Sequence, residues 1–468
     1  MASLAKERVQ GHQHLYKRGI KLPSHESRRK EMMQRQRKQR AALLHKARAL
    51  VCGSTRKHNG QEGAMEVDAE AQPLPGKRRG GSGARRRRRY ADELVEPEWL
   101  MTAPHDLFLN SGEDAPVDTL AGGSTSSRAA QGGGSLEDDD EPGWYVLPRP
   151  EGKRCLMVAH NGRTVTQDKN GIRVHQFQSI LPNGSQMTRT GGGSDAYSIF
   201  DCVFNQDLCT YIITDLLCWK GQSLYGCTAS LRFHWARVRL EETGISVSSE
   251  ASLRASGGMA GMMAMGATDE DMGEEYGIVL APSFLSTKES VYRCLTDSFG
   301  YQADGVLFVA RGGYYEPGEL PSPLMLVWKN ENVSRYFRRA ARAANIPAAL
   351  GTLCNDGAGS PAVLSLGVTL KCSDERQQIM TTREGVQVLC AQTIAFGSEA
   401  QGGGEAAGGV VPFPYRLNRL YKFEVFYGRS HSNEGVFYGI YRGNGPKRRV
   451  HPDMHSRIMF HFVVPKLL

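Results

Sequence analysis

The chain has 468 residues, of which 40% are hydrophobic and 23% charged, and its formal net charge is +9. This length and composition allow two or three domains with at least one sizeable core. No run approaches the ~18 apolar residues of a membrane span, and the first residues, MASLAKERVQGHQH, lack the apolar core of a signal peptide. We therefore expect a soluble protein that is not secreted. The ten cysteines have irregular spacings without a C-x-x-C pair, which favours reduced thiols in a nuclear or cytosolic setting.

The positive charge is concentrated in an N-terminal arm. Residues 1–90 hold 24 Lys and Arg and 7 Asp and Glu, a balance of +17, so the remaining residues carry −8. Such an arm suits an acidic partner, protein or RNA. Residues 24–51 predict a helix, because Pro23 and Ser24 give a start signal and no Gly or Pro follows. Its apolar residues are few, so we expect it to order on a partner; a solvated charge run without a specific partner is the alternative.

Residues 52–142 are rich in Gly, Ser and charge, which predicts a disordered linker with a basic cluster at 77–89 and a short apolar island, ADELVEPEWLM, at 91–101. From residue 143, short β-branched runs alternate with turn signals. The expected fold class is α+β: a mixed, antiparallel-rich β domain at 143–335 with a low-complexity insert at 245–276, and a smaller β-rich module at 336–468. A basic stretch, RYFRRAARAA, predicts a short helix between them. The predicted strands are GWYVLP, CLMVAHNGRTVTQ, YSIFDCVFN, CTYIITDLLCW, LRFHWARVRL, GVLFVA, LMLVWK, AVLSLGVTL, GVQVLCAQTIAF, YKFEVFYG, GVFYGIYRG and RIMFHFVV.

Five segments in order match the pattern of a nucleotide-handling enzyme: RPEGKR (149–154), DKNG (168–171), DCV (201–203), ADGVLF (303–308) and LVWK (326–329). They resemble the K-x-D-G-x-R, S-R-N-G, D-G-E, D/E-G-L-V-F and L-K-x-K elements of covalent nucleotidyltransferases, the RNA capping guanylyltransferases and polynucleotide ligases. The central β domain is therefore expected to resemble the nucleotide-binding domain of mRNA guanylyltransferases.

The departures from that pattern fall on the residues that do chemistry. Arg149 replaces the nucleophilic lysine, and a guanidinium stays protonated and cannot attack a phosphate. Val203 stands for the acidic residue of D-G-E, and Val327 for the first lysine of L-K-x-K. We therefore expect a protein that is not an enzyme and needs no metal or cofactor, but that keeps a nucleotide-shaped cleft.

A second set of segments makes a closer resemblance. HLYKRGIKLPSHESRRKEMMQRQRKQRAALLHKARAL precedes PEWL (97–100), and GKR, DKNG, DCVFN, CWKG, RFHW, DGVLF and YEPG follow in order. These segments resemble the snurportin family, adaptors that recognise the trimethylguanosine cap of spliceosomal small nuclear RNAs and carry their RNPs into the nucleus. The resemblance covers roughly residues 13–335 and leaves the C-terminal module unplaced. It implies a protein that shuttles between nucleus and cytoplasm, with importin β, the capped RNP and an export receptor as partners and no membrane.

The resemblance also assigns site residues. Trp328 is expected to stack on the methylated guanine, Trp99 to form the apolar wall beside it, and Arg154 and Lys169 to contact phosphates. Methylation at N7 makes guanine cationic, and a desolvated cation over a Trp face gains about 2 kcal/mol. Pro97 stands at a cap-binding position where the family is expected to have Ser, and it has no hydroxyl to offer.

The basic residues of the predicted helix are assigned to importin β: Arg28, Arg29, Lys30, Arg35, Arg37, Lys38 and Arg40. Two other functions remain open at this point, a residual guanylyltransferase and an RNA-binding protein in which the basic arm itself holds the RNA. A metal site at His451, His455 and His461 is not expected, because no Cys or carboxylate accompanies them at ligand spacing.

Overall fold

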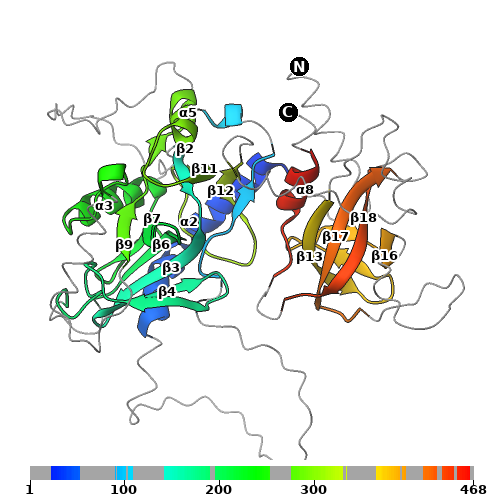
Figure 1. Ribbon diagram of the computed structural model, residues 1–468, viewed down its shortest axis with the longest axis horizontal. Coiled ribbons are helices and arrows are strands. Elements are labelled where there is room, and N and C mark those ends of the chain that lie inside the picture. The colour runs from blue at the N-terminus through cyan, green and yellow to red at the C-terminus, as the bar shows by residue number, and fades with distance from the viewer. Residues whose placement is uncertain are drawn as a thin grey trace, which may run out of the picture.

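The computed structural model describes residues 23–52, 90, 92–101, 104–108, 142–189, 196–252, 276–329, 334, 365–390, 393–396, 415–429, 435–446 and 451–463. Most of the predicted linker at 52–142, the insert beyond residue 252 and the helix predicted in RYFRRAARAA lie outside these residues. Within them the predicted α+β class is confirmed, since three mostly antiparallel sheets are combined with helices (Figure 1).

A five-stranded sheet forms the first layer. Its strands, in spatial order, are β1 (Pro97–Trp99), β12 (Ser322–Trp328), β11 (Ala303–Ala310), β2 (Trp144–Pro150) and β10 (Phe284–Leu285). β1 runs parallel to β12 and the other pairs are antiparallel. The PEWL segment thus enters the sheet as an edge strand, and Trp99 lies directly opposite Val327.

A seven-stranded sheet packs against the first. Its main path is β5 (Arg173–Phe177), β4 (Arg163–Asp168), β3 (Lys153–His160), β6 (Ser198–Asn205), β7 (Thr210–Trp219) and β8 (Gln222–Ser223), and β9 (Gly277–Leu280) pairs with β7 in parallel. The predicted Asn161-Gly162 turn joins β3 to β4; both residues have positive φ, 54° and 73°, as a type I′ hairpin requires. One apolar cluster joins the two sheets, with Leu147 and Leu307 from the first and Leu156 and Ile212 from the second.

Helices α3 (Ala229–Glu241) and α5 (Lys288–Thr296) and the 3-10 turn η3 (Pro104–Leu107) complete this part. The strand predicted in LRFHWARVRL is wrong, because that segment lies in α3. Its buried residues recur at helical spacing: Ala229, Arg232, Phe233, Ala236 and Leu240. The Thr228 side chain caps the helix by accepting from the Leu231 N–H. Arg232 is buried against the Asp215 carboxylate, at 2.9 Å from Nε to Oδ1, so one charged residue of this segment faces inward.

The C-terminal module is a six-stranded sheet with one helix. In spatial order it contains β15 (Gln387–Leu389), β14 (Ile379–Thr381), β13 (Ser365–Asp374), β17 (Leu420–Arg429), β18 (Gly435–Asn444) and β16 (Ile394–Phe396). The strand predicted in RIMFHFVV is instead α8 (His455–Val463), whose Ile458 and Phe462 lie one turn apart and are buried against the sheet. In Figure 1, α8 lies on the side of the module that faces the other two sheets.

The basic helix is α2 (His25–Cys52), close to its predicted bounds of 24–51. The expectation that it orders only on a partner is wrong, because Leu43, Ala47, Leu50 and Val51 are buried in the core cluster of the protein itself. Their spacing places all four on one face of the helix. The buried Gln36 adds two hydrogen bonds to the Tyr314 backbone, donating to its carbonyl at 3.1 Å and accepting from its N–H at 2.9 Å. A short apolar stripe and the hydrogen bonds of Gln36 thus help to hold the helix on the protein.

Candidate functional site

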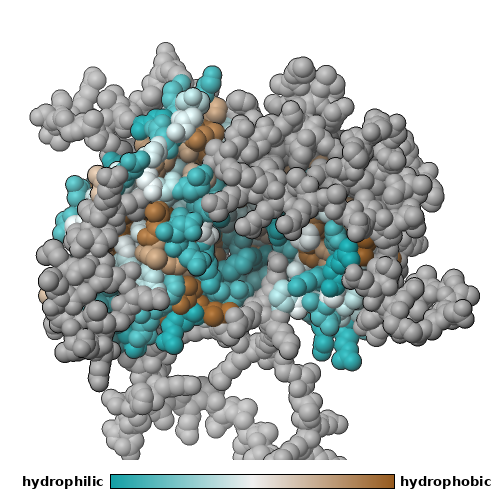
Figure 2. Space-filling view, viewed as in Figure 1, coloured by the Kyte–Doolittle hydropathy of each residue, from teal (hydrophilic) through white to brown (hydrophobic). Residues whose placement is uncertain are grey.

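A cleft of about 950 Å³ opens where residues 94–99, the ends of the first two sheets and the C-terminal module meet. Figure 2 shows hydrophilic residues gathered around a hollow between the two parts of the molecule. Six Lys or Arg and four Asp or Glu line the cleft: Arg149, Lys153, Arg154, Lys169, Lys329 and Arg457, with Glu96, Glu151, Asp168 and Asp304. The cleft therefore carries a cationic excess although the protein outside its arm is net negative, which suits a phosphorylated ligand.

Two motif glycines allow close backbone approaches at or next to the cleft. Gly152, in the RPEGKR turn between β2 and β3, has φ of +145°, and a Cβ there would lie 2.1 Å from the Phe204 carbonyl oxygen. Gly305, in β11, has φ of +107°, and a Cβ would lie 2.4 Å from the Trp328 carbonyl oxygen. Both positions need a residue without a side chain. The glycines of the nucleotidyltransferase-like motifs thus let strands approach closely where the cleft forms.

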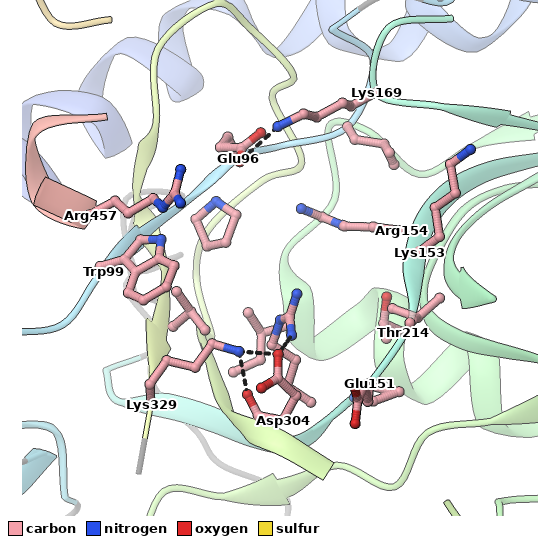
Figure 3. A pocket seen from close by; sticks show the side chains of 18 of the residues that line it. Glu96, Trp99, Glu151, Lys153, Arg154, Lys169, Thr214, Asp304, Lys329 and Arg457 are labelled. Atoms are coloured by element: carbon pink, nitrogen blue, oxygen red, sulfur yellow. Dashed lines mark hydrogen bonds and ion pairs between the residues drawn. The ribbon is translucent and has the colours of Figure 1, made fainter. Parts of the chain in front are cut away.

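Arg149 lies inside the cleft, where it pairs with Asp304 at 2.5 Å from Nη1 to Oδ2 (Figure 3). Lys329 contacts the same carboxylate and also donates to the Asp304 backbone carbonyl at 2.5 Å. Burial, together with the charge of Arg149, lowers the pKa of Lys329 to about 7. Burial alone would raise the pKa of Asp304, but Lys329 and Arg149 lower it below its usual value. Two cations thus share one carboxylate, which leaves positive charge for a ligand.

Arg154, expected to contact phosphates, lines the cleft but is already engaged. Its Nε and Nη2 donate to the carboxylate of Asp201, and its Nη1 donates to the Val95 carbonyl. Tyr315 donates its hydroxyl to the same Asp201 at 2.8 Å. Burial opposes the charge of Arg154, but the attraction of Asp201 raises its pKa overall. Arg154 therefore holds residues 94–96 against the second sheet and has some donors left for a ligand.

Lys169, the second expected phosphate contact, lies at the rim of the cleft, with its side chain 57% exposed and its Nζ 3.8 Å from Glu96 Oε1. The DKNG loop that carries it is closed by Asp168, whose Oδ1 accepts from the N–H groups of Asn170 and Ile172 at 3.0 and 2.9 Å. A fixed loop with an exposed amine is well placed for an anionic ligand.

Trp99 and Pro97 are brought into the cleft by β1. The Trp99 ring packs edge-on against Phe460 of α8, with centroids 5.0 Å apart, and the Lys329 Nζ lies 5.9 Å from its centroid. Figure 3 shows the Trp99 ring and the end of Lys329 on the same side of the cleft. Trp99 is thus an indole held in place beside cationic groups. Pro97 adds a further apolar group to that wall.

Trp328 does not lie in the cleft. Side chains alternate along β12, so Val327 and Lys329 line the cleft while Trp328 points to the opposite face of the sheet. There it packs with Met32 and Met33 of α2 against a core cluster that contains Leu326 and Phe308. The structure therefore places the residue expected to stack on the base away from the other four expected cap contacts.

The residues expected to bind importin β lie along α2 in differing surroundings. Lys30, Arg35, Arg37, Lys38 and Arg40 are exposed, and Arg28 and Arg29 are partly buried. Arg28 pairs with Glu98 of β1, Arg29 and Lys30 with Glu26, and Arg35 with Glu316 at 3.0 Å. Arg40 donates to the Gly226 carbonyl at 3.1 Å. The basic helix thus presents an exposed cationic side while being tied to the protein by part of its charge.

Sequence reasoning missed Lys329 and Arg457 as cleft residues. Lys329 stands at the second lysine of the L-K-x-K-like segment, so the alternation of β12 could have identified it. Arg457 had no such signal, because α8 was predicted as a strand of an unplaced module. Among the described residues no group of three or more His, Cys, Asp or Glu is arranged to hold a metal. No described helix is long and apolar enough to cross a membrane.

Several solved structures share a faint likeness with the chain. A structure named Pmar-Lig_PreS3 is 10% identical with a TM-score of 0.26, over 64% of this chain and 63% of that one. Mycobacterial DNA ligase D complexed with ATP and MES is 12% identical (TM-score 0.25, 65% and 89%). Chlorella virus DNA ligase-adenylate is 9% identical (0.24, 65% and 95%). The chain spans about 63% of the length of the first, and these TM-scores are too low to assign a fold or function.

The family comparison is more specific. Residues 135–254, which run from before β2 to beyond α3, match the family model described as Snurportin1, m3G cap-binding domain. The matched residues include the RPEGKR turn, the DKNG loop and the buried β6 and β7, which together form one wall of the cleft. Residues 135–254 are therefore similar to the cap-binding domain of snurportin.

Proposed function

We propose that the protein is a nuclear import adaptor that binds the trimethylguanosine cap of small nuclear RNAs in the cleft and importin β through α2. The observation that carries the proposal is the match of residues 135–254 to the m3G cap-binding domain, together with the cationic cleft that those residues help to form. Capped RNP, importin β and an export receptor are its expected partners, and it is expected to shuttle between cytoplasm and nucleus.

The chemistry of the cleft fits the two halves of a cap. The methylated guanine is cationic and carries apolar methyl groups, and Trp99 offers it an aromatic face. The phosphate chain is anionic, and three lysines that line the cleft offer it positive charge: Lys153, Lys169 and Lys329. Dimethylation at N2 removes hydrogen-bond donors, which favours an indole wall over a polar one. The base should therefore lie against Trp99 and the phosphates among the lysines.

The importin β part of the proposal rests on the exposed cations of α2. Because α2 is packed on the protein through Leu43, Ala47, Leu50 and Val51, a partner that encloses the helix has to displace these contacts. A partner that contacts only the exposed side of α2 leaves these contacts in place. If importin β has to displace them, it should bind the full protein more weakly than the isolated helix, by the free energy with which α2 docks on the protein.

The cap part of the proposal is tested by titrating the full chain with trimethylguanosine and monomethylguanosine cap dinucleotides, following the tryptophan fluorescence. Tighter binding of the trimethyl cap supports the proposal, and no saturable binding of either cap contradicts it. The importin part is tested by pull-down with importin β before and after deletion of residues 13–51. Loss of capture with cap binding retained supports it, and unchanged capture contradicts it.

One observation favours a second candidate, a residual nucleotidyltransferase. The lowered pKa of Lys329, about 7, gives a fraction of neutral amine in the cleft, as a lysine nucleophile needs. Against it, the Lys329 Nζ is bound to two acceptors of Asp304, the carboxylate and the carbonyl. Incubation with labelled GTP and a denaturing gel decides between the two: no adduct is expected, and an adduct that Lys329→Arg abolishes would establish the enzyme.

A further inference from the structure

The C-terminal module forms one wall of the cleft. Ser365, Leu366 and Gly367 at the start of β13 and Arg457 and His461 of α8 line it together with the residues of the first two sheets. This module lies outside residues 135–254, which match the cap-binding family model. The lining therefore includes groups that the family match does not account for.

Helix α8 fixes the position of Trp99. The Trp99 backbone N–H donates to Ser456 Oγ at 3.3 Å, and the Phe460 ring packs against the indole at 5.0 Å and 62°. On its other face β1 is tied to α2 through Glu98, which pairs with Arg28. Since β1 is a three-residue edge strand, these contacts add to its pairing with β12 in fixing how the indole faces the cleft.

Arg457 is paired with a buried carboxylate. Its Nη1 lies 2.5 Å from Asp453 Oδ1, and Asp453, which is 4% exposed, also accepts from the Thr369 N–H at 2.7 Å. One pairing leaves a guanidinium with further N–H donors for a ligand. Arg457 also lines a side chamber of about 250 Å³ next to the cleft, where Lys169 and Arg383 supply positive charge and Asp92, Glu96 and Asp453 negative charge.

The two walls face each other across the cleft. In Figure 3, Arg457 and Trp99 lie on one side, Lys153 and Arg154 on the other, and Lys169 between them at the rim. An anion bound between these walls would contact a cationic side chain on each of them. A cap has such an anion, its phosphate chain, directly attached to the base that Trp99 is positioned to contact.

We propose that the C-terminal module is half of the cap-binding site: Arg457 binds the phosphate chain of the capped RNA, and α8 positions Trp99 for the base. This inference rests on the proposed cap-binding function. It assigns the phosphate contact to a residue outside the family match, and it makes the module necessary for affinity rather than an appendage. A phosphate held by Arg457 on one wall and Lys169 at the rim explains why the cationic excess is shared between distant parts of the chain.

The test compares Arg457→Ala with Arg442→Ala in the full chain. Arg442 is a suitable control because it lies on β18 of the same module, is 40% exposed and pairs with Glu424, and neither residue of this pair lines the cleft. The probes are the trimethylguanosine cap dinucleotide and the trimethylguanosine nucleoside, which lacks phosphate. Arg457→Ala should weaken dinucleotide binding about tenfold, leave nucleoside binding within about twofold, and reduce the slope of log affinity against log salt by about one. Arg442→Ala should change none of these.

A second pair of variants keeps the result interpretable if Arg457→Ala destabilises α8. Arg457→Lys retains the charge and should recover most of the dinucleotide affinity, while Phe460→Leu, which loosens Trp99, should weaken nucleoside and dinucleotide alike. Equal dinucleotide affinity of Arg457→Ala and Arg442→Ala, with circular dichroism unchanged, would overturn the inference while leaving the proposed function intact. If the parent protein binds neither probe, the proposed function itself fails.

Discussion

The two faces of the five-stranded sheet differ in what they cover, and two tryptophans mark the difference. Trp99 on β1 and Trp328 on β12 belong to paired strands one residue apart in register, since Trp99 lies opposite Val327. Trp99 faces the cleft, with Lys329 and the C-terminal helix around it. Trp328 faces α2 and the core cluster behind the sheet. The two neighbouring indoles therefore have different roles: Trp99 is available to a ligand, and Trp328 is packed into the protein.

This difference connects two functions across one strand. Pro97 and Trp99 point into the cleft, while Glu98 between them pairs with Arg28 of α2 on the other face. Desolvation raises the pKa of the Glu98 carboxyl, and the charge of Arg28 opposes that rise. The segment that presents an indole to the cleft thus also anchors the proposed importin-binding helix. Substitutions on either face therefore show how separate the two faces are.

The largest effect is expected for Trp328→Ala, on stability. Removing an indole packed against Met32, Met33 and the core cluster should lower the free energy of unfolding by about 2–3 kcal/mol, less than for a fully buried Trp because Trp328 is only partly buried. Cap affinity should stay within about twofold of the parent. Urea denaturation and cap titration at a temperature where the variant is folded measure the two quantities. A large loss of affinity without a loss of stability would show that Trp328 reaches the ligand after all.

Trp99→Ala should show the opposite pattern. Loss of an aromatic face costs roughly 1–3 kcal/mol per stacked base, so trimethyl cap affinity should fall about tenfold or more. The loss for monomethyl cap should be smaller, because the N2 methyl groups are the additional apolar contact. Stability should change less than for Trp328→Ala, since the ring lines the cleft and packs edge-on against Phe460. The same loss for both caps would mean that Trp99 does not read the N2 methyl groups.

The pH dependence of binding should report on Lys329. Its pKa in the free protein is about 7, and a bound phosphate raises it, so binding above pH 7 takes up a proton and affinity should fall several-fold between pH 7 and 8.5. Stability of the free protein should change in the opposite sense. The unfolded chain keeps this proton up to pH ~10, so the contribution of Lys329 makes the protein more stable as pH rises from 7 to 10.

Lys329→Arg is the matched control for both trends. An arginine keeps its proton throughout this range, and the same ligand is titrated with both proteins, so any protonation of the cap itself cancels in the comparison. The decrease in affinity with pH should be shallower for the variant. Parallel curves for the two proteins would exclude Lys329 as the titrating group.

The smallest effect is expected on the helix face. Glu316→Gln removes the carboxylate that pairs with Arg35 but leaves the sequence of α2 unchanged. If importin β competes with the protein for α2, weaker docking should increase importin β affinity about twofold to fivefold. Glu242→Gln is a control, because Glu242 pairs with Arg239 on α3 and not with α2. An unchanged or lower affinity would mean that importin β binds α2 without displacing it.

Sequence alone determined the elements that depend on local patterns. The Asn161-Gly162 turn, the apolar runs of β6 and β7 and the span of α2 follow from nearest neighbours along the chain, through turn preferences, β-branched residues and the lack of helix breakers. The motif glycines Gly152 and Gly305 belong here too, since only glycine adopts their backbone conformation without strain. The order of the motif segments along the chain also gave the resemblance that the family match supports for residues 135–254.

The tertiary structure decided which face each residue serves. Period-2 alternation predicts two faces but not which of them lines the cleft. Pairing of β12 with β1 and β11 places Val327 and Lys329 on the cleft face and Trp328 on the core face. In the same way, the sequence shows four apolar residues on α2, but only the tertiary structure shows that they are buried in the core of the protein. Arg457 joined the site through contacts between segments more than 280 residues apart along the printed sequence, Trp99 and α8 among them. Contacts of this kind depend on how separate elements pack, and no local pattern in the sequence encodes that packing.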